Sequence, residues 1–220
     1  MIPLLLVVVI DLIGFGIIIP LLPFYAETFG ASPQKVTMLM VIFSLSQFVA
    51  APIWGGLSDK YGRRLIIWIT LAGSILAYIF LAYSNTLYSL FIARAFAGFM
   101  AGNISTAQAY MSDITTKENR AKAMGFFGAA FGIGFILGPA IGGILAGSDP
   151  KSPNTFLPPI FAASLSTFAL LLALFLLKDT RSLIKPNKNK RIVSLLEALK
   201  VAKLGQLILL SFIVTVVFAS

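Results

Sequence analysis

Two charged residues stand inside long apolar runs of this sequence. Asp11 follows the run MIPLLLVVVI, and Arg94 lies within LYSLFIARAFAGFMA. A charge at bilayer depth costs a few kcal/mol, so it persists where it faces a cavity or a partner, and it usually has a role. We expect Asp11 to bind and release a proton or to recognise a cation. The alternatives are structural: a hydrogen bond from Asp11 to a neighbouring helix, and from Arg94 to carbonyl groups of the first helix.

The composition is that of a membrane protein. Hydrophobic types make up 58% of the 220 residues, charged types only 11%, and the mean hydropathy is +0.94. A soluble domain is nearer half apolar and one-quarter charged. The absence of cysteine excludes disulfides and thiol nucleophiles, and the absence of histidine removes the commonest general base and metal ligand. We therefore expect no enzyme activity, no metal site and no cofactor.

Apolar runs of about 20 residues, the length that crosses a bilayer, recur along the chain. They lie at about 2–24, 36–57, 65–83, 87–111, 123–146 and 157–177. The sequence predicts an all-α membrane protein with a six-helix transmembrane bundle over residues 1–177. A basic linker over residues 178–203 and the start of a seventh helix over residues 204–220 are expected to follow.

The basic residues gather on one side of these spans. The connections on that side, including the linker, hold most of the 17 lysines and arginines, whereas the other side has only Lys35 and Lys151. The positive-inside rule places the N-terminus, the loops after even-numbered helices and the linker in the cytoplasm. The sequence thus predicts a multi-pass protein of the inner or plasma membrane. The charge of +9 reports this topology rather than a nucleic-acid partner, and basic contacts with lipid headgroups are compatible with it.

The stretch GGLSDKYGRR, residues 55–64, joins the second and third spans. We expect Gly55 to let its helix approach a neighbour and Gly62 to permit a tight turn. The turn then holds three charged side chains at the cytoplasmic surface: Asp59, Arg63 and Arg64. Positive-inside anchoring alone explains the basic residues, but neither the acid nor the spacing of the glycines.

Four motifs resemble those of the major facilitator superfamily. Residues 55–64 resemble motif A, which lies between the second and third helices of that family. GFILGPAIGG, residues 134–143, resembles motif C of its antiporters, with the residues Gly134, Gly138, Pro139, Gly142 and Gly143. Arg94 with Gly98 and Gly102 resembles motif B, although Ala97 stands where glutamine is usual. The first helix, DLIGFGIIIPLLP from Asp11, is similar to that of drug:proton antiporters, especially the tetracycline-efflux group.

The resemblance implies the N-terminal half of a twelve-helix transporter that works by alternating access. It implies that Asp59 and the arginines of motif A latch the cytoplasmic side against the missing C-terminal six-helix half, with Asp59 facing a helix N-terminus. We expect Arg63 to pair with Asp113. The implied partners are a small-molecule substrate, protons and the lipid bilayer, with proton entry through Asp11 exchanged for exit of a drug or metabolite.

In the same family, the arginine at the position of Arg94 is linked to proton transfer. The rise per residue puts Asp11 and Arg94 roughly 10 Å apart in depth. That separation favours a relay through water or backbone over a direct ion pair.

Gly134, Gly138 and Gly142 repeat every four residues in the fifth span and predict a smooth stripe for close helix packing. Pro139 is expected to bend this helix. Packing explains most of the pattern. The functional interpretation adds that this smooth interface can rock during alternating access.

Polar and aromatic residues of the first, second and fourth spans are candidates to line a substrate cavity: Phe15, Gln47, Gly98, Asn103 and Gln108. Helix packing or lipid contact is the alternative for each of them. Two other functions remain open, a truncated or split half that transports nothing by itself and a nutrient:proton symporter.

Overall fold

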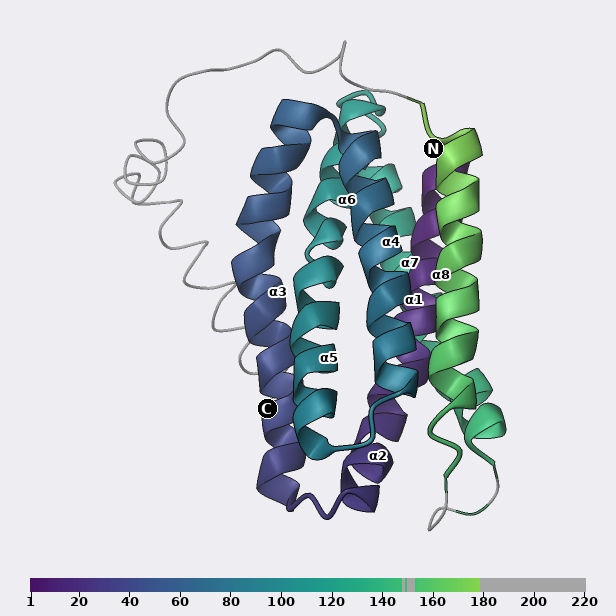
Figure 1. Ribbon diagram of the computed structural model, residues 1–220. Coiled ribbons are helices and arrows are strands. Elements are labelled where there is room, and N and C mark those ends of the chain that lie inside the picture. Colours follow the sequence, from purple (N-terminus) through teal and green to yellow (C-terminus); the bar gives the residue numbers. More distant parts are fainter. Residues whose placement is uncertain (148, 150–152, 179–220) are drawn as a thin grey trace, which may run out of the picture. The chain divides into compact units, whose positions relative to one another are not determined.

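Six helical segments are long and apolar enough to cross a membrane in the part of the chain that the structure describes. The computed structural model describes residues 1–147, 149 and 153–178, which form a bundle of helices (Figure 1). The segments are Ile2–Thr28, Pro33–Tyr61, Arg63–Ala82, Leu87–Asp113, Arg120–Ala146 and Leu157–Leu176. The predicted all-α bundle of six membrane helices is therefore confirmed. The expected linker, beyond its first residue, and the expected seventh helix lie outside the described residues.

Two of the six segments are built from more than one helix. The first contains α1 (Ile2–Ile18), the short 3₁₀ turn η1 (Ile19–Leu21) and α2 (Leu22–Thr28). Pro20 and Pro23 lie at the start of η1 and α2, where the missing proline N–H groups interrupt the α-helical hydrogen bonds. The others are α3 (Pro33–Tyr61), α4 (Arg63–Ala82), α5 (Leu87–Ala101) with α6 (Asn103–Asp113), α7 (Arg120–Ala146) and α8 (Leu157–Leu176).

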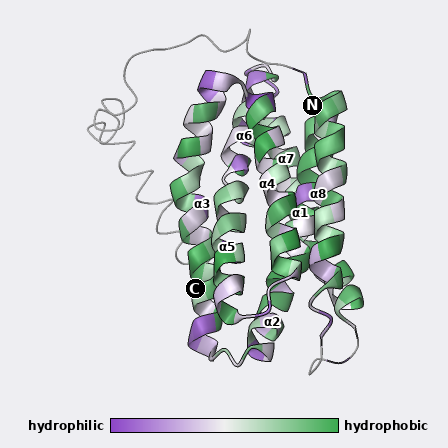
Figure 2. Cartoon of the chain, viewed as in Figure 1, coloured by the Kyte–Doolittle hydropathy of each residue, from purple (hydrophilic) through white to green (hydrophobic). Residues whose placement is uncertain are grey.

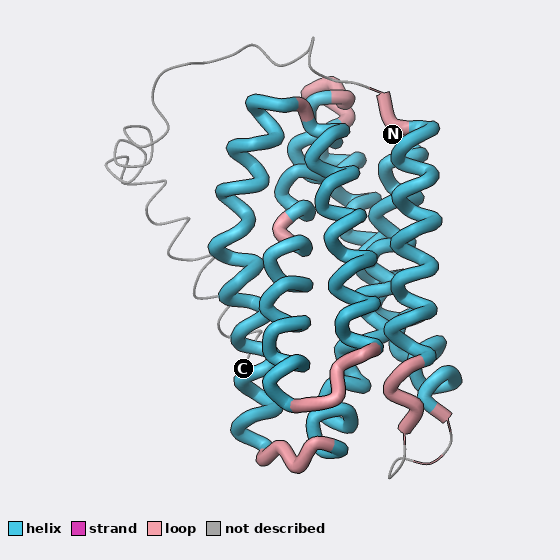
Figure 3. Tube along the Cα trace, in the orientation of Figure 1, coloured by secondary structure: helices cyan, strands magenta, loops and turns pink. Residues whose placement is uncertain are grey.

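The fourth segment, which the sequence predicts as one span over 87–111, is interrupted at Gly102. The break appears in Figure 3 as a short loop between α5 and α6. Two side chains of α3 donate hydrogen bonds to backbone carbonyls beside this break. Trp54 Nε1 donates to the Phe99 carbonyl at 2.7 Å, and Gln47 Nε2 donates to the Ala101 carbonyl at 3.2 Å. Such bonds satisfy the backbone groups that a broken helix leaves unpaired in lipid.

The helices pack in a fixed set of neighbours. α1 lies against α7 and α8, α4 lies against α8 and α5, and α3 lies against α5 and α6. Hydrophobic residues recur along every helix (Figure 2), and many of them are exposed on the outside of the bundle. Phe48, Ile144 and Phe175 are 78%, 81% and 82% exposed. An exterior of this kind suits lipid rather than water.

The glycine stripe of α7 faces α1. A Cβ added to Gly138 would lie 2.5 Å from the carbonyl carbon of Gly16, and one added to Gly134 would lie 2.7 Å from Leu12 Cβ. Gly142 meets the backbone of Ile17 in the same way. The predicted stripe therefore makes a backbone-to-backbone contact. Two other residues of motif C stand apart from it: Pro139 lies half-buried inside α7, and Gly143 is exposed with nothing within 4 Å of an added Cβ.

Candidate functional site

Asp11 lies in the middle of α1, and the residues before and after it in this helix are apolar. The side chains of Asn103 on α6 and Ser166 on α8 approach its carboxylate. Its Oδ1 and the Ser166 Oγ are nevertheless enclosed without a hydrogen-bond partner among the described residues. Asn103 is the first residue of α6, so the break in the fourth segment places an amide and a helix N-terminus beside this acid.

Arg94 on α5 is only 3% exposed. Its guanidinium carbon lies 4.3 Å from the centre of the Phe43 ring, which is a cation–π contact. Its Nε has no hydrogen-bond partner, and no carboxylate pairs with it, in the part of the chain that the structure describes. Gly98, four residues further along α5, explains the contact, because an added Cβ there would overlap the Phe43 carbonyl oxygen. This close approach of α3 brings the ring under the arginine.

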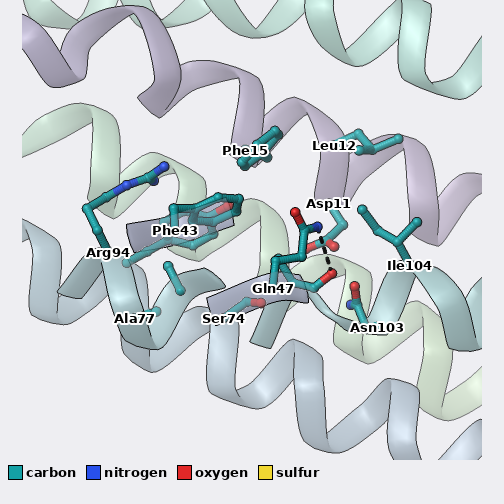
Figure 4. Close-up of a pocket in the computed structure, with 13 residues that line it drawn as sticks. Asp11, Leu12, Phe15, Phe43, Gln47, Ser74, Ala77, Arg94, Asn103 and Ile104 are labelled. Carbon is teal, nitrogen blue, oxygen red and sulfur yellow. Dashed lines mark hydrogen bonds between the residues drawn. The ribbon is translucent and has the colours of Figure 1, made fainter. Parts of the chain in front are cut away.

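One cavity contains both charged residues (Figure 4). Arg94 stands at one end, and the rings of Phe15 and Phe43 lie between it and Asp11. These rings stack with their centres 5.1 Å apart and their planes at 28°. The polar side chains that line the cavity come from α1, α3, α4, α5 and α6: Asp11, Gln47, Ser74, Tyr78, Arg94 and Asn103. The cavity therefore offers one acid, one base, an aromatic wall and several hydrogen-bonding groups.

The structure brings only some of the predicted cavity residues together. Phe15, Gln47 and Asn103 line the cavity with Asp11. Gly98 is buried against the α3 backbone, and its lack of a side chain lets α3 approach α5 closely. Gln108 is exposed and lies outside the cavity lining.

Sequence reasoning missed the contribution of α4. Ser74, Ala77 and Tyr78 all line the cavity. Ser74 and Tyr78 are four residues apart, so they lie on one helical face. That spacing of two polar side chains within an apolar run was the available signal.

A second charged cluster lies where α3 turns into α4, at the end of the bundle that we call the basic end, defined by Arg63 and Arg120. Arg63 Nη1 lies 2.6 Å from Asp59 Oδ1, and Arg63 Nε donates to Asp113 Oδ2 at 3.0 Å. Nη1 also donates to Ser58 Oγ at 2.5 Å. Gly62 makes the turn possible with a φ of 99°, a value that side chains rarely allow. The structure thus joins α3, α4 and α6 through one arginine.

Two other residues of this stretch make contacts of a different kind. Arg64 points away from the acids: its Nη2 donates to the Leu174 carbonyl of α8 at 2.6 Å, and its guanidinium lies 4.3 Å from the centre of the Trp68 ring. Gly55 was expected to allow a close helix approach. An added Cβ would find only Ser105 Oγ, at 4.0 Å, so packing within the described residues does not require glycine there.

Comparison with known families decides the class of protein. The family model described as Major Facilitator Superfamily matches residues 4–220, almost the whole chain. The chain belongs to the Major Facilitator Superfamily. It is 37% identical over 180 residues to the tetracycline resistance protein, class H, of Pasteurella multocida, covering 80% of this chain and 44% of that protein. It is 31% identical over 170 residues to the quinolone resistance protein NorA of Staphylococcus aureus, covering 77% and 42%.

A solved structure of the superfamily shows the same arrangement of helices. The crystal structure of the human organic anion transporter MFSD10 (TETRAN) matches with a TM-score of 0.69 and 26% identity. The match covers 81% of this chain and 47% of that one. The chain therefore spans about half the length of the superfamily members that it matches, and it is a multi-pass membrane protein.

Proposed function

We propose that this superfamily chain forms the N-terminal half of a proton-coupled exporter of a drug or small metabolite. The observation that carries the proposal is the cavity that contains Asp11 and Arg94. Arg94 is buried, Asp11 is half-buried with its Oδ1 enclosed, and neither has an ion-pair partner in the described residues. Such groups are costly in a membrane, and they mark ion and substrate pathways.

The cavity chemistry suits exchange of a proton for a substrate. Asp11 takes a proton from the side of the membrane opposite the cytoplasm. This protonation removes the negative charge that faces Asn103. The stacked pair Phe15 and Phe43 offers an apolar wall for a flat organic molecule, and Gln47 and Asn103 offer hydrogen bonds. Arg94 remains as the cation of the site. Proton and substrate then occupy the cavity in alternation, as the cycle of an antiporter requires.

The cluster around Arg63 is proposed as the gate at the cytoplasmic side. The side chains of Arg63, Asp59 and Asp113 are 11%, 23% and 26% exposed. Ion pairs with this partial contact to water are modest in energy, so they can break and reform in each cycle. The other half of the gate would come from a C-terminal bundle of six helices. The N-terminus and the basic connections lie in the cytoplasm in this proposal, and the protein resides in the cell membrane.

The names of the relatives support export. They include tetracycline resistance proteins, a quinolone resistance protein and the multidrug resistance protein 2 of Bacillus subtilis. Two alternatives remain testable: a half that does not transport by itself, and a nutrient:proton symporter. The chain covers 44% of the length of the class H protein, so the first alternative is tested with residues 1–220 alone.

The test is transport in everted membrane vesicles from bacteria that express the gene at its full length. Respiration acidifies the interior of such vesicles, so a drug:proton antiporter accumulates the drug inside, whereas a symporter drives it out. Asp11→Asn should abolish accumulation while the protein remains in the membrane. Glu27→Gln makes the same chemical change at an exposed acid of the same segment, and it should transport normally. Unchanged accumulation in Asp11→Asn would contradict the coupling role.

A parallel preparation expresses residues 1–220 alone. Accumulation by the full-length product, but not by residues 1–220, would assign transport to the two halves together. An antibody against the predicted linker, residues 178–191, measures the size and amount of both products in the same membranes.

A further inference from the structure

Tyr78 on α4 has no role in the chemistry described so far. It is 7% exposed, and it lines the cavity together with Asp11 and Arg94. Its hydroxyl reaches across to α1, where it lies 3.7 Å from the position that a Cβ on Gly14 would take. Gly14 is three residues after Asp11, so both lie on one face of α1. The phenol oxygen therefore ends on the face of α1 that carries the buried acid.

Tyr78 also lies near enough to both charges to interact with them. Both Asp11 and Arg94 act electrostatically on the phenol. No ion pair joins Asp11 to Arg94 among the residues that the structure describes. Tyr78 is thus an ionisable side chain of the cavity that interacts with both Asp11 and Arg94.

The hydroxyl is suited to connect them. A phenol both donates and accepts hydrogen bonds, and no direct hydrogen bond joins the Tyr78 hydroxyl to Asp11 or Arg94 in the structure. The groups that face it are Asp11 from α1 and Arg94 from α5, with Ser74 on its own helix. Gln47 from α3 and Asn103 from α6 complete the polar lining. One ordered water is enough to close a gap between polar groups that do not touch directly.

We propose that Tyr78 is a positioning residue that couples the proton on Asp11 to the cation of Arg94. Its hydroxyl donates to the ionised Asp11 carboxylate and accepts from the Arg94 guanidinium, in each case directly or through one water. This inference rests on the proposed proton-coupled transport. Tyr78 is the link between Asp11 and Arg94 in that cycle.

The exchange of hydrogen bonds balances without covalent change. The proton that arrives binds a carboxylate oxygen of Asp11, and Tyr78 keeps its own proton throughout. A hydrogen bond to an ionised acceptor is stronger than one to a neutral carboxyl group. Protonation of Asp11 therefore weakens its hydrogen bond with the Tyr78 hydroxyl. Arg94 then no longer interacts with a negative charge on Asp11 through the phenol. Arg94 is then available to acceptor groups of the substrate.

The variant Tyr78→Phe tests the link, because it removes one oxygen and keeps the ring. Tyr83→Phe is the matched control directly after the same helix: Tyr83 is 63% exposed, and its ring contact with Phe156 survives the change. In everted vesicles, Tyr78→Phe should lower uphill drug accumulation by about fivefold to 150-fold, the range of ordinary coupling between sites. Counterflow of drug without a proton gradient should persist, and the pH profile of transport should change. Tyr83→Phe should match the wild type in all three measurements.

A spectroscopic measurement separates failure of this inference from failure of the proposed function. The infrared C=O band of the protonated Asp11 carboxyl is assigned in the purified protein by its loss in Asp11→Asn. Tyr78→Phe should move this band, and Tyr83→Phe should not. An unmoved band together with wild-type uphill transport in Tyr78→Phe would overturn the inference. A wild-type protein without proton-driven transport would overturn the proposed function instead, whatever the band does.

Discussion

At the scale of single residues, the buried arginine of α5 is held in an unusual way. Arg94 has an aromatic ring on one side and a cavity on the other, without a carboxylate partner among the described residues. A planar guanidinium stacks on a ring and still presents its donors at the edge, which a lysine ammonium cannot do. The geometry therefore uses the shape of the side chain as well as its charge.

Arg94→Lys is expected to fail as a conservative change. The cation is kept, but the stacked contact with Phe43 and the fork of donors are lost. We expect drug accumulation in everted vesicles to fall at least about tenfold, the effect of roughly 1.4 kcal/mol. Arg120→Lys is the control, because Arg120 is exposed at the basic end and donates to the Ser112 carbonyl. Equal transport by Arg94→Lys and the wild type would show that charge alone matters.

At the scale of secondary-structure elements, the contact of α1 with α7 depends on the absence of side chains. Gly138 and Gly16 meet backbone to backbone, and α1 also carries Asp11. The packing of α7 therefore sets the position of the acid relative to the rest of the bundle.

Gly138→Ala is expected to destabilise the folded protein. Its Cβ would lie 2.5 Å from the Gly16 carbonyl carbon, so the helices must move apart, at a cost of about 1–3 kcal/mol for overpacking. Gly132→Ala on the same helix has nothing within 4 Å of its Cβ, and the gain in helix propensity should leave stability equal or slightly higher. Thermal unfolding of the purified protein in detergent compares the two variants. A wild-type unfolding temperature for Gly138→Ala would refute the close contact.

The elements also show what the sequence could and could not predict. The six spans followed from apolar length, and the α7 stripe followed from a spacing of four, because both signals are local. The break at Gly102 was missed because a glycine in an apolar run is also compatible with a continuous helix. Its carbonyls are satisfied by Gln47 and Trp54, about 50 residues away in the chain. Tyr78 was missed for a similar reason: its spacing from Ser74 marks a polar face of α4, but only the packing of α4 against its neighbours shows that this face meets the cavity.

At the scale of the whole molecule, the cavity and the basic end should be coupled, since α3, α4 and the fourth segment contribute to both. Arg63 holds the three together through Asp59, Ser58 and Asp113. Arg64 lies next to it in sequence but holds α8 through the Leu174 carbonyl. Neighbouring arginines thus have separable tasks, one across the proposed gate and one within the bundle.

That separation gives a test of the gate. Residues 1–220 contain no cysteine, so a cysteine introduced by Ala97→Cys is the single thiol of this half and reports access to the cavity wall. Arg63→Gln should speed labelling of this cysteine by a membrane-impermeant maleimide added from the basic side, because the proposed closed state loses both ion pairs. A shift of about 1 kcal/mol changes the open population roughly fivefold. Arg64→Gln has the same loss of charge but leaves the acids paired, so the labelling rate should stay at the wild-type value. Faster labelling in both variants would indicate general loosening of the bundle, and no change in Arg63→Gln would show that these ion pairs do not hold the cavity closed.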